Sequence, residues 1–113
     1  MPSRNAAQSE EEQLLQYLSH EQVEELRQLF MEQARTMLSE LLAARAQWVH
    51  DSTQDKPLRA IAHTLKGSGA SFGFGRVTQA ADRVEGAAPA DLARELKELI
   101  VQLELVLRDE ASR

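Results

Sequence analysis

The chain has 113 residues, of which 42% are hydrophobic and 27% are charged. This length supports one domain, because two domains would each be too short to bury a separate core. The net charge of −5 disfavours nucleic acid and anionic membranes as partners. The absence of cysteine excludes a disulfide framework, a thiolate metal site and a thiol nucleophile. No apolar run reaches the roughly 18 residues of a membrane span, so we expect a soluble, cytoplasmic domain.

The N-terminal 18 residues divide into two predicted segments. Residues 1–8 are small and polar, and we expect them to form a flexible tail. Three glutamates at positions 10–12 favour the positive end of a helix, which predicts a short helix over residues 9–18. The folded domain is therefore expected over residues 9–113.

A long helix is predicted from Ser19 to His50. Ser19 and Gln22 have the spacing of a capping box, in which each side chain bonds the other residue's backbone amide. Apolar residues then recur at helical spacing and form one stripe: Val23, Phe30, Ala34, Met37, Leu41, Ala44 and Trp48. This pattern indicates a helix that packs on one side only.

Three further helices are predicted after a polar connection over residues 51–55. Pro57 favours a helix start and Gly73 a helix end, which gives a helix to about residue 72. The next helix extends from Gly75 to Gly86, and the last follows Pro89. Their apolar positions are Leu58, Ile61, Ala62 and Leu65, then Val77, Ala80, Ala81 and Val84, and finally Leu92, Leu96, Leu99, Leu103 and Val106. We expect an all-α antiparallel four-helix bundle with an additional short N-terminal helix.

Enzyme signatures are largely absent from the chain. It has no nucleophile elbow, no phosphate-binding loop and no cluster of acidic metal ligands. The three histidines are His20, His50 and His63, and none is three or four residues from another, as paired helical metal ligands would be. We therefore expect no cofactor or metal on this chain.

His63 is predicted to be exposed, because at about 100° per residue it lies roughly 140° to 160° from the apolar positions Leu58 and Leu65. Four residues lie within about 60° of it, which predicts an open imidazole flanked by positive charge: Arg59, Lys66, Gly67 and Ala70. A glycine inside a helix costs about 0.5 to 1 kcal/mol relative to alanine, so a gain elsewhere should offset Gly67. For Gly69 we favour close packing between helices as that gain.

The segment from Ala62 to Ala70, with Gly73 and the pair Val84 and Glu85, resembles the signature of histidine-containing phosphotransfer (Hpt) domains. The pattern is a histidine, a lysine three residues later, an adjacent glycine, a glycine six residues further and an acidic or amide residue near the end of the next helix. The departures are mild, since Val77 and Val84 replace commoner leucine or isoleucine.

The resemblance implies that His63 accepts a phosphoryl group from one receiver domain and passes it to the aspartate of another. It implies that Lys66 stabilises the phosphoryl group, that Gly67 leaves room for the receiver, and that Mg²⁺ belongs to that receiver. Glu85 is a candidate for orienting the imidazole, the alternative being a solvated acid at a helix end. Receiver contacts are expected from Arg59, Gly67, Ala70, Arg76 and Arg83. We expect a monomeric carrier and not an autonomous kinase.

Three alternatives stay open. A sensor-kinase phosphoacceptor domain also displays a histidine on a helix, but there an acid typically follows it, where this chain has Thr64. A helical adaptor would bind receivers or other proteins without chemistry. A phosphotransfer domain of a chemotaxis-type or hybrid kinase would share the same signature.

The charge is unevenly distributed along the chain. Residues 56–86 carry five basic and two acidic side chains, a net charge of +3, whereas the flanking parts are acidic. The basic residues are Lys56, Arg59, Lys66, Arg76 and Arg83. This segment contains His63, and its charge favours the acidic pocket of a receiver.

Overall fold

The computed structural model describes residues 19–71 and 73–111, and over these residues the chain is helical, without strands. The elements are α2 (His20–His50), α3 (Lys56–Ser71), α4 (Gly75–Gly86), the short 3₁₀ helix η1 (Pro89–Asp91) and α5 (Leu92–Ala111). The all-α prediction is confirmed. The tail predicted over residues 1–8 and the helix predicted over residues 9–18 lie outside the described residues.

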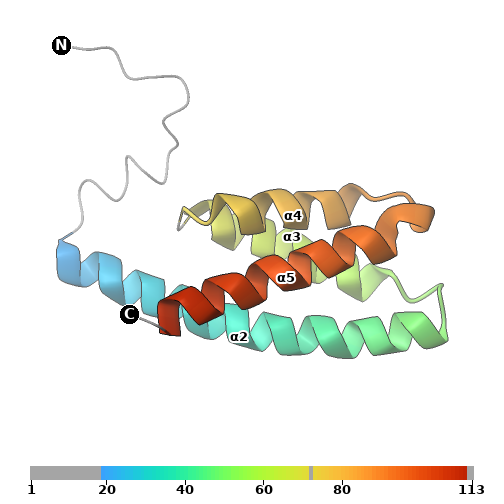
Figure 1. Ribbon diagram of the computed structural model, residues 1–113, viewed down its shortest axis with the longest axis horizontal. Coiled ribbons are helices and arrows are strands. Elements are labelled where there is room, and N and C mark those ends of the chain that lie inside the picture. Colours follow the sequence, from blue (N-terminus) through green and yellow to red (C-terminus); the bar gives the residue numbers. More distant parts are fainter. Residues whose placement is uncertain (1–18, 72, 112–113) are drawn as a thin grey trace, which may run out of the picture.

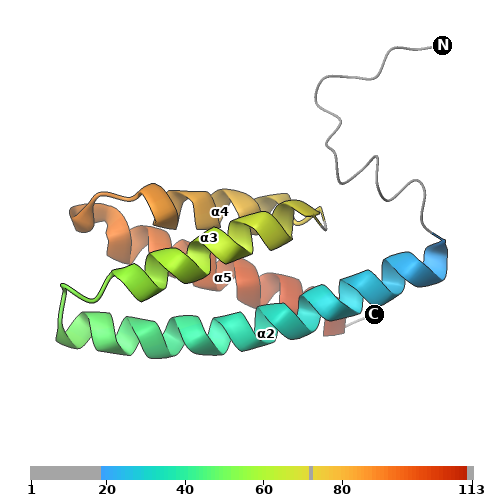
Figure 2. The ribbon, with the colours of Figure 1, turned by 180° about the vertical axis from the view of Figure 1, so that it is seen from behind.

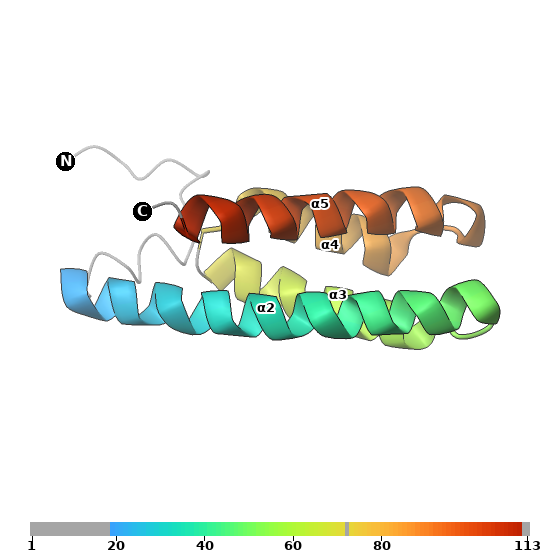
Figure 3. The ribbon, with the colours of Figure 1, turned by 60° about the horizontal axis from the view of Figure 1, so that its bottom comes forward.

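The four long helices form an antiparallel bundle (Figures 1 and 2). Each helix packs against the next in sequence, and α5 returns to α2. Viewed from below, α2 and α3 form one layer, and α4 and α5 form the other (Figure 3). None of the described helices combines the length and the apolar character needed to cross a membrane.

The predicted helix boundaries match the observed ones closely. The backbone N–H of Gln22 donates to Oγ of Ser19 at 3.1 Å, and the N–H of Ser19 donates to Oε1 of Gln22 at 2.9 Å. The capping box is therefore confirmed. Helix α3 begins at Lys56, one residue before the predicted start, so Pro57 lies in the first turn, where its missing N–H is tolerated.

The connection between α3 and α4 depends on two glycines. Gly73 has a φ of 77°, the left-handed conformation predicted for this helix end. At Gly69, a Cβ atom would lie 2.6 Å from Oγ1 of Thr78, so the two helices approach too closely for a side chain. The packing interpretation of Gly69 is confirmed.

The core is mostly aliphatic and draws on all four long helices. Its buried residues are Phe30, Met31, Ala34, Leu41, Leu58, Ala62, Leu65, Val77, Ala80, Ala81, Val84, Leu92, Leu96, Leu99, Ile100 and Leu103. Phe30 stacks on Phe74 with ring centroids 4.5 Å apart, which fixes the end of the bundle near Gly73. The predicted stripe of α2 is correct in direction, although it omits the buried Met31.

Candidate functional site

The imidazole of His63 lies on the outer surface of α3. Its side chain is 69% exposed, whereas Ala62 and Leu65 on the same helix are fully buried. The predicted exposure of His63 is confirmed. Because the flanking apolar residues fix the rotation of α3 against the core, they also fix the direction in which the histidine projects.

Glu85 lies beside this imidazole, although 22 residues separate the two in sequence. Oε2 of Glu85 is 2.5 Å from Nδ1 of His63. A carboxylate can only accept a hydrogen bond, so Nδ1 carries the hydrogen, and Nε2 of a neutral ring keeps its lone pair. The structure therefore places Glu85 in contact with the histidine and not alone in solvent at the helix end.

Lys66 completes the network from the next turn of α3. Its Nζ lies 2.6 Å from Oε1 of Glu85 and 3.3 Å from Oδ1 of Asp82. The hydrogen bond from Lys66, followed by that from His63, holds the pKa of Glu85 below its ordinary value of 4.5. The bonds to Glu85 and Asp82 likewise raise the pKa of Lys66 above 10.5. All four groups are solvent-accessible, and each hydrogen bond of the network has at least one charged partner.

Asp82 was not among the predicted site residues. The signal that identifies it is its spacing, because residues three apart share a helix face and Asp82 precedes Glu85 by three. The positive charge predicted beside the imidazole is thus accompanied by two carboxylates from α4, of which Glu85 was a predicted site residue.

Gly67 and Ala70 continue the surface beyond Lys66. A Cβ atom at Gly67 would meet no atom within 4 Å, so this turn of α3 is open. Ala70 is half-buried and adds only a methyl group. The surface beside His63 therefore carries no large side chain at Gly67 or Ala70, and it is sterically open, as the sequence predicted.

Arg59 has a different position from the one expected. It lies one turn before His63, but its guanidinium is directed at the end of α4. Nη1 of Arg59 donates to the carbonyl oxygens of Val84 and Glu85, at 3.2 and 3.1 Å. Nε donates to Oδ2 of Asp55 at 2.9 Å. The cation is therefore engaged within the bundle, and its predicted contact with a receiver stays a prediction.

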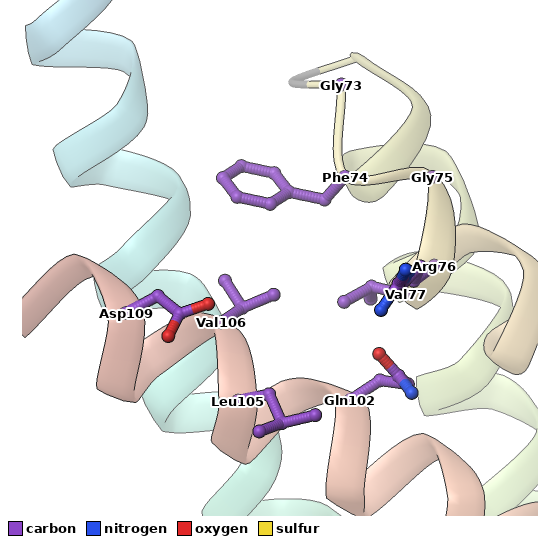
Figure 4. Close-up of a pocket in the computed structure, with 9 residues that line it drawn as sticks. All are labelled: Gly73, Phe74, Gly75, Arg76, Val77, Gln102, Leu105, Val106 and Asp109. Atoms are coloured by element: carbon purple, nitrogen blue, oxygen red, sulfur yellow. The ribbon is translucent and has the colours of Figure 1, made fainter.

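Arg76 and Arg83 lie on the side of α4 that faces α5. Seven residues separate them, so they share one face, and Arg83 is about 160° around the helix from Glu85. Arg76 lines a cavity of about 390 Å³ between the α3–α4 turn and α5 (Figure 4), together with Phe74, Gln102 and Asp109 among others. Neither arginine is brought together with His63.

A comparison with known protein families matches most of the chain. The family model described as Hpt domain matches residues 25–112, which include every residue of the network. Searches of curated proteins and of solved structures found no match to the chain. The family match covers most of the chain, slightly less than the predicted domain of residues 9–113. The chain belongs to the Hpt domain family, whose members have a phosphotransfer role in phosphorelay signalling and interact with receiver domains.

Proposed function

We propose that His63 accepts a phosphoryl group from the aspartyl phosphate of a receiver domain and passes it to the aspartate of a response regulator. The observation that carries this proposal is the exposed imidazole whose Nδ1 is bound to Glu85. It lies within the segment matched by the Hpt family. The donor and acceptor receivers are partners of this one surface, used in succession.

The first transfer is a displacement at phosphorus by the lone pair on Nε2. A bond forms between Nε2 and phosphorus while the bond from phosphorus to the aspartate oxygen breaks, and the aspartate leaves as a carboxylate. The hydrogen on Nδ1 stays in place, since positive charge that develops on the ring is stabilised by the carboxylate of Glu85. Transfer to the second receiver reverses these events, and the neutral ring is restored.

Lys66 stabilises the transferred group. An ammonium has three N–H donors, and the contacts with Glu85 and Asp82 use two of them. The third is available to a phosphoryl oxygen while negative charge is redistributed during transfer. Lys66 therefore acts as a point charge close to the nucleophile in this proposal.

The open surface at Gly67 and Ala70 is the proposed docking area for the receiver, with Arg76 and Arg83 as more distant basic contacts. In this proposal the receiver supplies Mg²⁺, and the chain itself is a cytoplasmic, monomeric carrier without a cofactor. A phosphotransfer domain of a chemotaxis-type or hybrid kinase would use the same chemistry, and its partners would differ.

The test is a transfer assay with receiver domains of the source organism, each first charged with radiolabelled phosphoryl. Wild-type chain and His50→Gln should be labelled by a subset of the receivers, whereas His63→Gln should stay folded and unlabelled. ATP alone should label none of them. Undiminished labelling of His63→Gln would contradict the proposal. Receiver binding without any labelling of the wild type would favour an adaptor.

A further inference from the structure

We propose that Arg59 is a positioning residue for the phosphoacceptor, because it fixes the backbone at the end of α4 and thereby holds the Glu85 carboxylate against His63. This inference rests on the proposed function of His63. It differs from the receiver contact that the sequence suggested for Arg59, since it assigns the side chain an intramolecular role.

The contacts of Arg59 connect three parts of the chain. Its Nη1 donates to the carbonyl oxygens of Val84 and Glu85, and its Nε donates to Asp55, which precedes α3. The side chain is only 23% exposed. The hydrogen bond from Arg59 also lowers the pKa of Asp55, in agreement with a charged pair at neutral pH. Opposite edges of the guanidinium are thus engaged, which fixes its orientation.

The end of α4 needs such a partner. The last four carbonyl groups of a helix have no intrahelical donor, and they form the negative end of the helix dipole. The main-chain hydrogen bond to the Val84 carbonyl is long, since the backbone nitrogen of Ala87 lies 3.4 Å from the carbonyl oxygen. Glu85 is one residue from the last residue of α4, where helices fray. A cation on these carbonyls therefore stabilises the turn that carries Glu85.

Three residues on one stripe of α3 bind this single glutamate. Arg59, His63 and Lys66 are spaced by four and three residues, so they project from the same face. Arg59 binds the backbone carbonyl of Glu85, while the other two bind its two carboxylate oxygens. Because backbone and carboxylate are held from one rigid helix, the carboxylate is aligned with the imidazole before any partner arrives.

The experiment compares Arg59→Gln and Arg59→Lys with the wild type by NMR of the His63 ring nitrogens and of the Glu85 carboxyl carbon. In Arg59→Gln the ring signals should move from the Nδ1–H form towards a mixture of tautomers, and the Glu85 titration midpoint should rise. The transfer rate at saturating receiver should fall by about tenfold, less than the roughly hundredfold that a misplacement of reacting groups by about 1 Å can cost, because Lys66 still holds the other carboxylate oxygen. The KM for the receiver should not change. Arg59→Lys should restore part of the wild-type ring signal, because lysine keeps the positive charge but lacks the planar guanidinium that binds several acceptors at once.

Two controls separate positioning from stability. Leu103→Val, in the buried core of α5, should lower the melting temperature without changing the His63 ring signals. Arg94→Gln removes an exposed arginine that pairs with Asp91 and Glu95, and it should also leave the ring unchanged. In a Glu85→Gln background, Arg59→Gln should add no further change to the ring.

Three results would overturn the inference. Unchanged ring signals in Arg59→Gln, with only a lower melting temperature, would make the residue purely structural. A raised KM with unchanged ring signals would make it a receiver contact. A ring change that persists in the Glu85→Gln background would show that it does not act through Glu85. The NMR measurements need no receiver, so they test the inference even if the wild type is never phosphorylated.

Discussion

The two sides of α4 differ in what their charges do. On the side facing α3, Glu85 and Asp82 bind Lys66, and Glu85 also binds His63. On the side facing α5, Arg76 lines a depression next to the α3–α4 turn, and Arg83 lines one near the start of α5, which Asp82 also borders. The net positive charge of residues 56–86 therefore does not describe the surroundings of the histidine. The net charge of a sequence segment gives the electrostatic surroundings of one residue only when the helix face of each charged side chain is known.

The largest expected effect comes from comparing one mutation on each of these two sides of α4. Glu85→Ala should lower the transfer rate at saturating receiver by at least about tenfold, since a histidine in the wrong tautomer loses most of its catalytic power. Arg83→Ala should change that rate by less than about twofold and affect mainly the association rate and its salt dependence. Single-turnover transfer assays at several salt concentrations measure both. Equal effects of the two variants on the saturated rate would erase the distinction.

A second contrast uses two glycines of α3. Gly69→Ala should destabilise the bundle by about 1 to 3 kcal/mol, because its Cβ atom would lie 2.6 Å from Thr78 Oγ1. Gly67→Ala is the matched control, and it should stabilise the chain by about 0.5 to 1 kcal/mol, since its Cβ atom meets nothing. Urea unfolding provides both values. If receivers dock on this surface, Gly67→Ala should nevertheless raise the KM for transfer, and an unchanged KM would place docking elsewhere.

The ion pair of Lys66 and Glu85 should set a pH window for the network. The pKa of Glu85 is lowered from 4.5, so its contribution to stability is complete above that value and is lost as pH falls through the folded-state pKa. The pKa of Lys66 is raised from 10.5, so its contribution is complete below that value and is lost as pH rises further. Carboxyl titration followed by NMR should give a Glu85 midpoint below 4.5. A midpoint at or above 4.5 would mean that the pair does not persist in solution.

The smallest expected effect concerns Asp82. Asp82→Asn should leave stability within about 0.5 kcal/mol, because exposed ion pairs contribute little. The same substitution removes a negative charge near the proposed phosphoryl position and one competitor for Lys66, so the phosphorylated fraction at equilibrium should rise modestly. Quantifying phosphorylated chain after equilibration with a charged receiver tests this. A fall in that fraction would show that Asp82 supports transfer.

The sequence predicts the features that depend on periodicity and on backbone chemistry. The capping box at Ser19, the left-handed Gly73 and the exposed face of His63 follow from local spacing, and all three occur in the structure. The contact between His63 and Glu85 was proposed through the family pattern, because no local rule relates residues 22 positions apart.

The directions of long side chains are not predictable in the same way. A helical wheel places the Cβ atom of Arg59 near His63, but the guanidinium lies several bonds further and is directed by the carbonyl groups of α4. The role of Asp82 likewise depends on how α4 is rotated against α3. Both features depend on how α3 and α4 pack against each other. That packing is determined by all the core contacts together, so no local sequence pattern reveals it.

The central claim is that Nε2 of His63 is the phosphoacceptor while Nδ1 stays bound to Glu85. The most direct measurement is ¹⁵N and ³¹P NMR of the chain after reaction with a charged receiver domain. We predict a single phosphorylated nitrogen, Nε2 of His63, with the hydrogen retained on Nδ1. Phosphorylation at Nδ1, or on any residue other than His63, would contradict it.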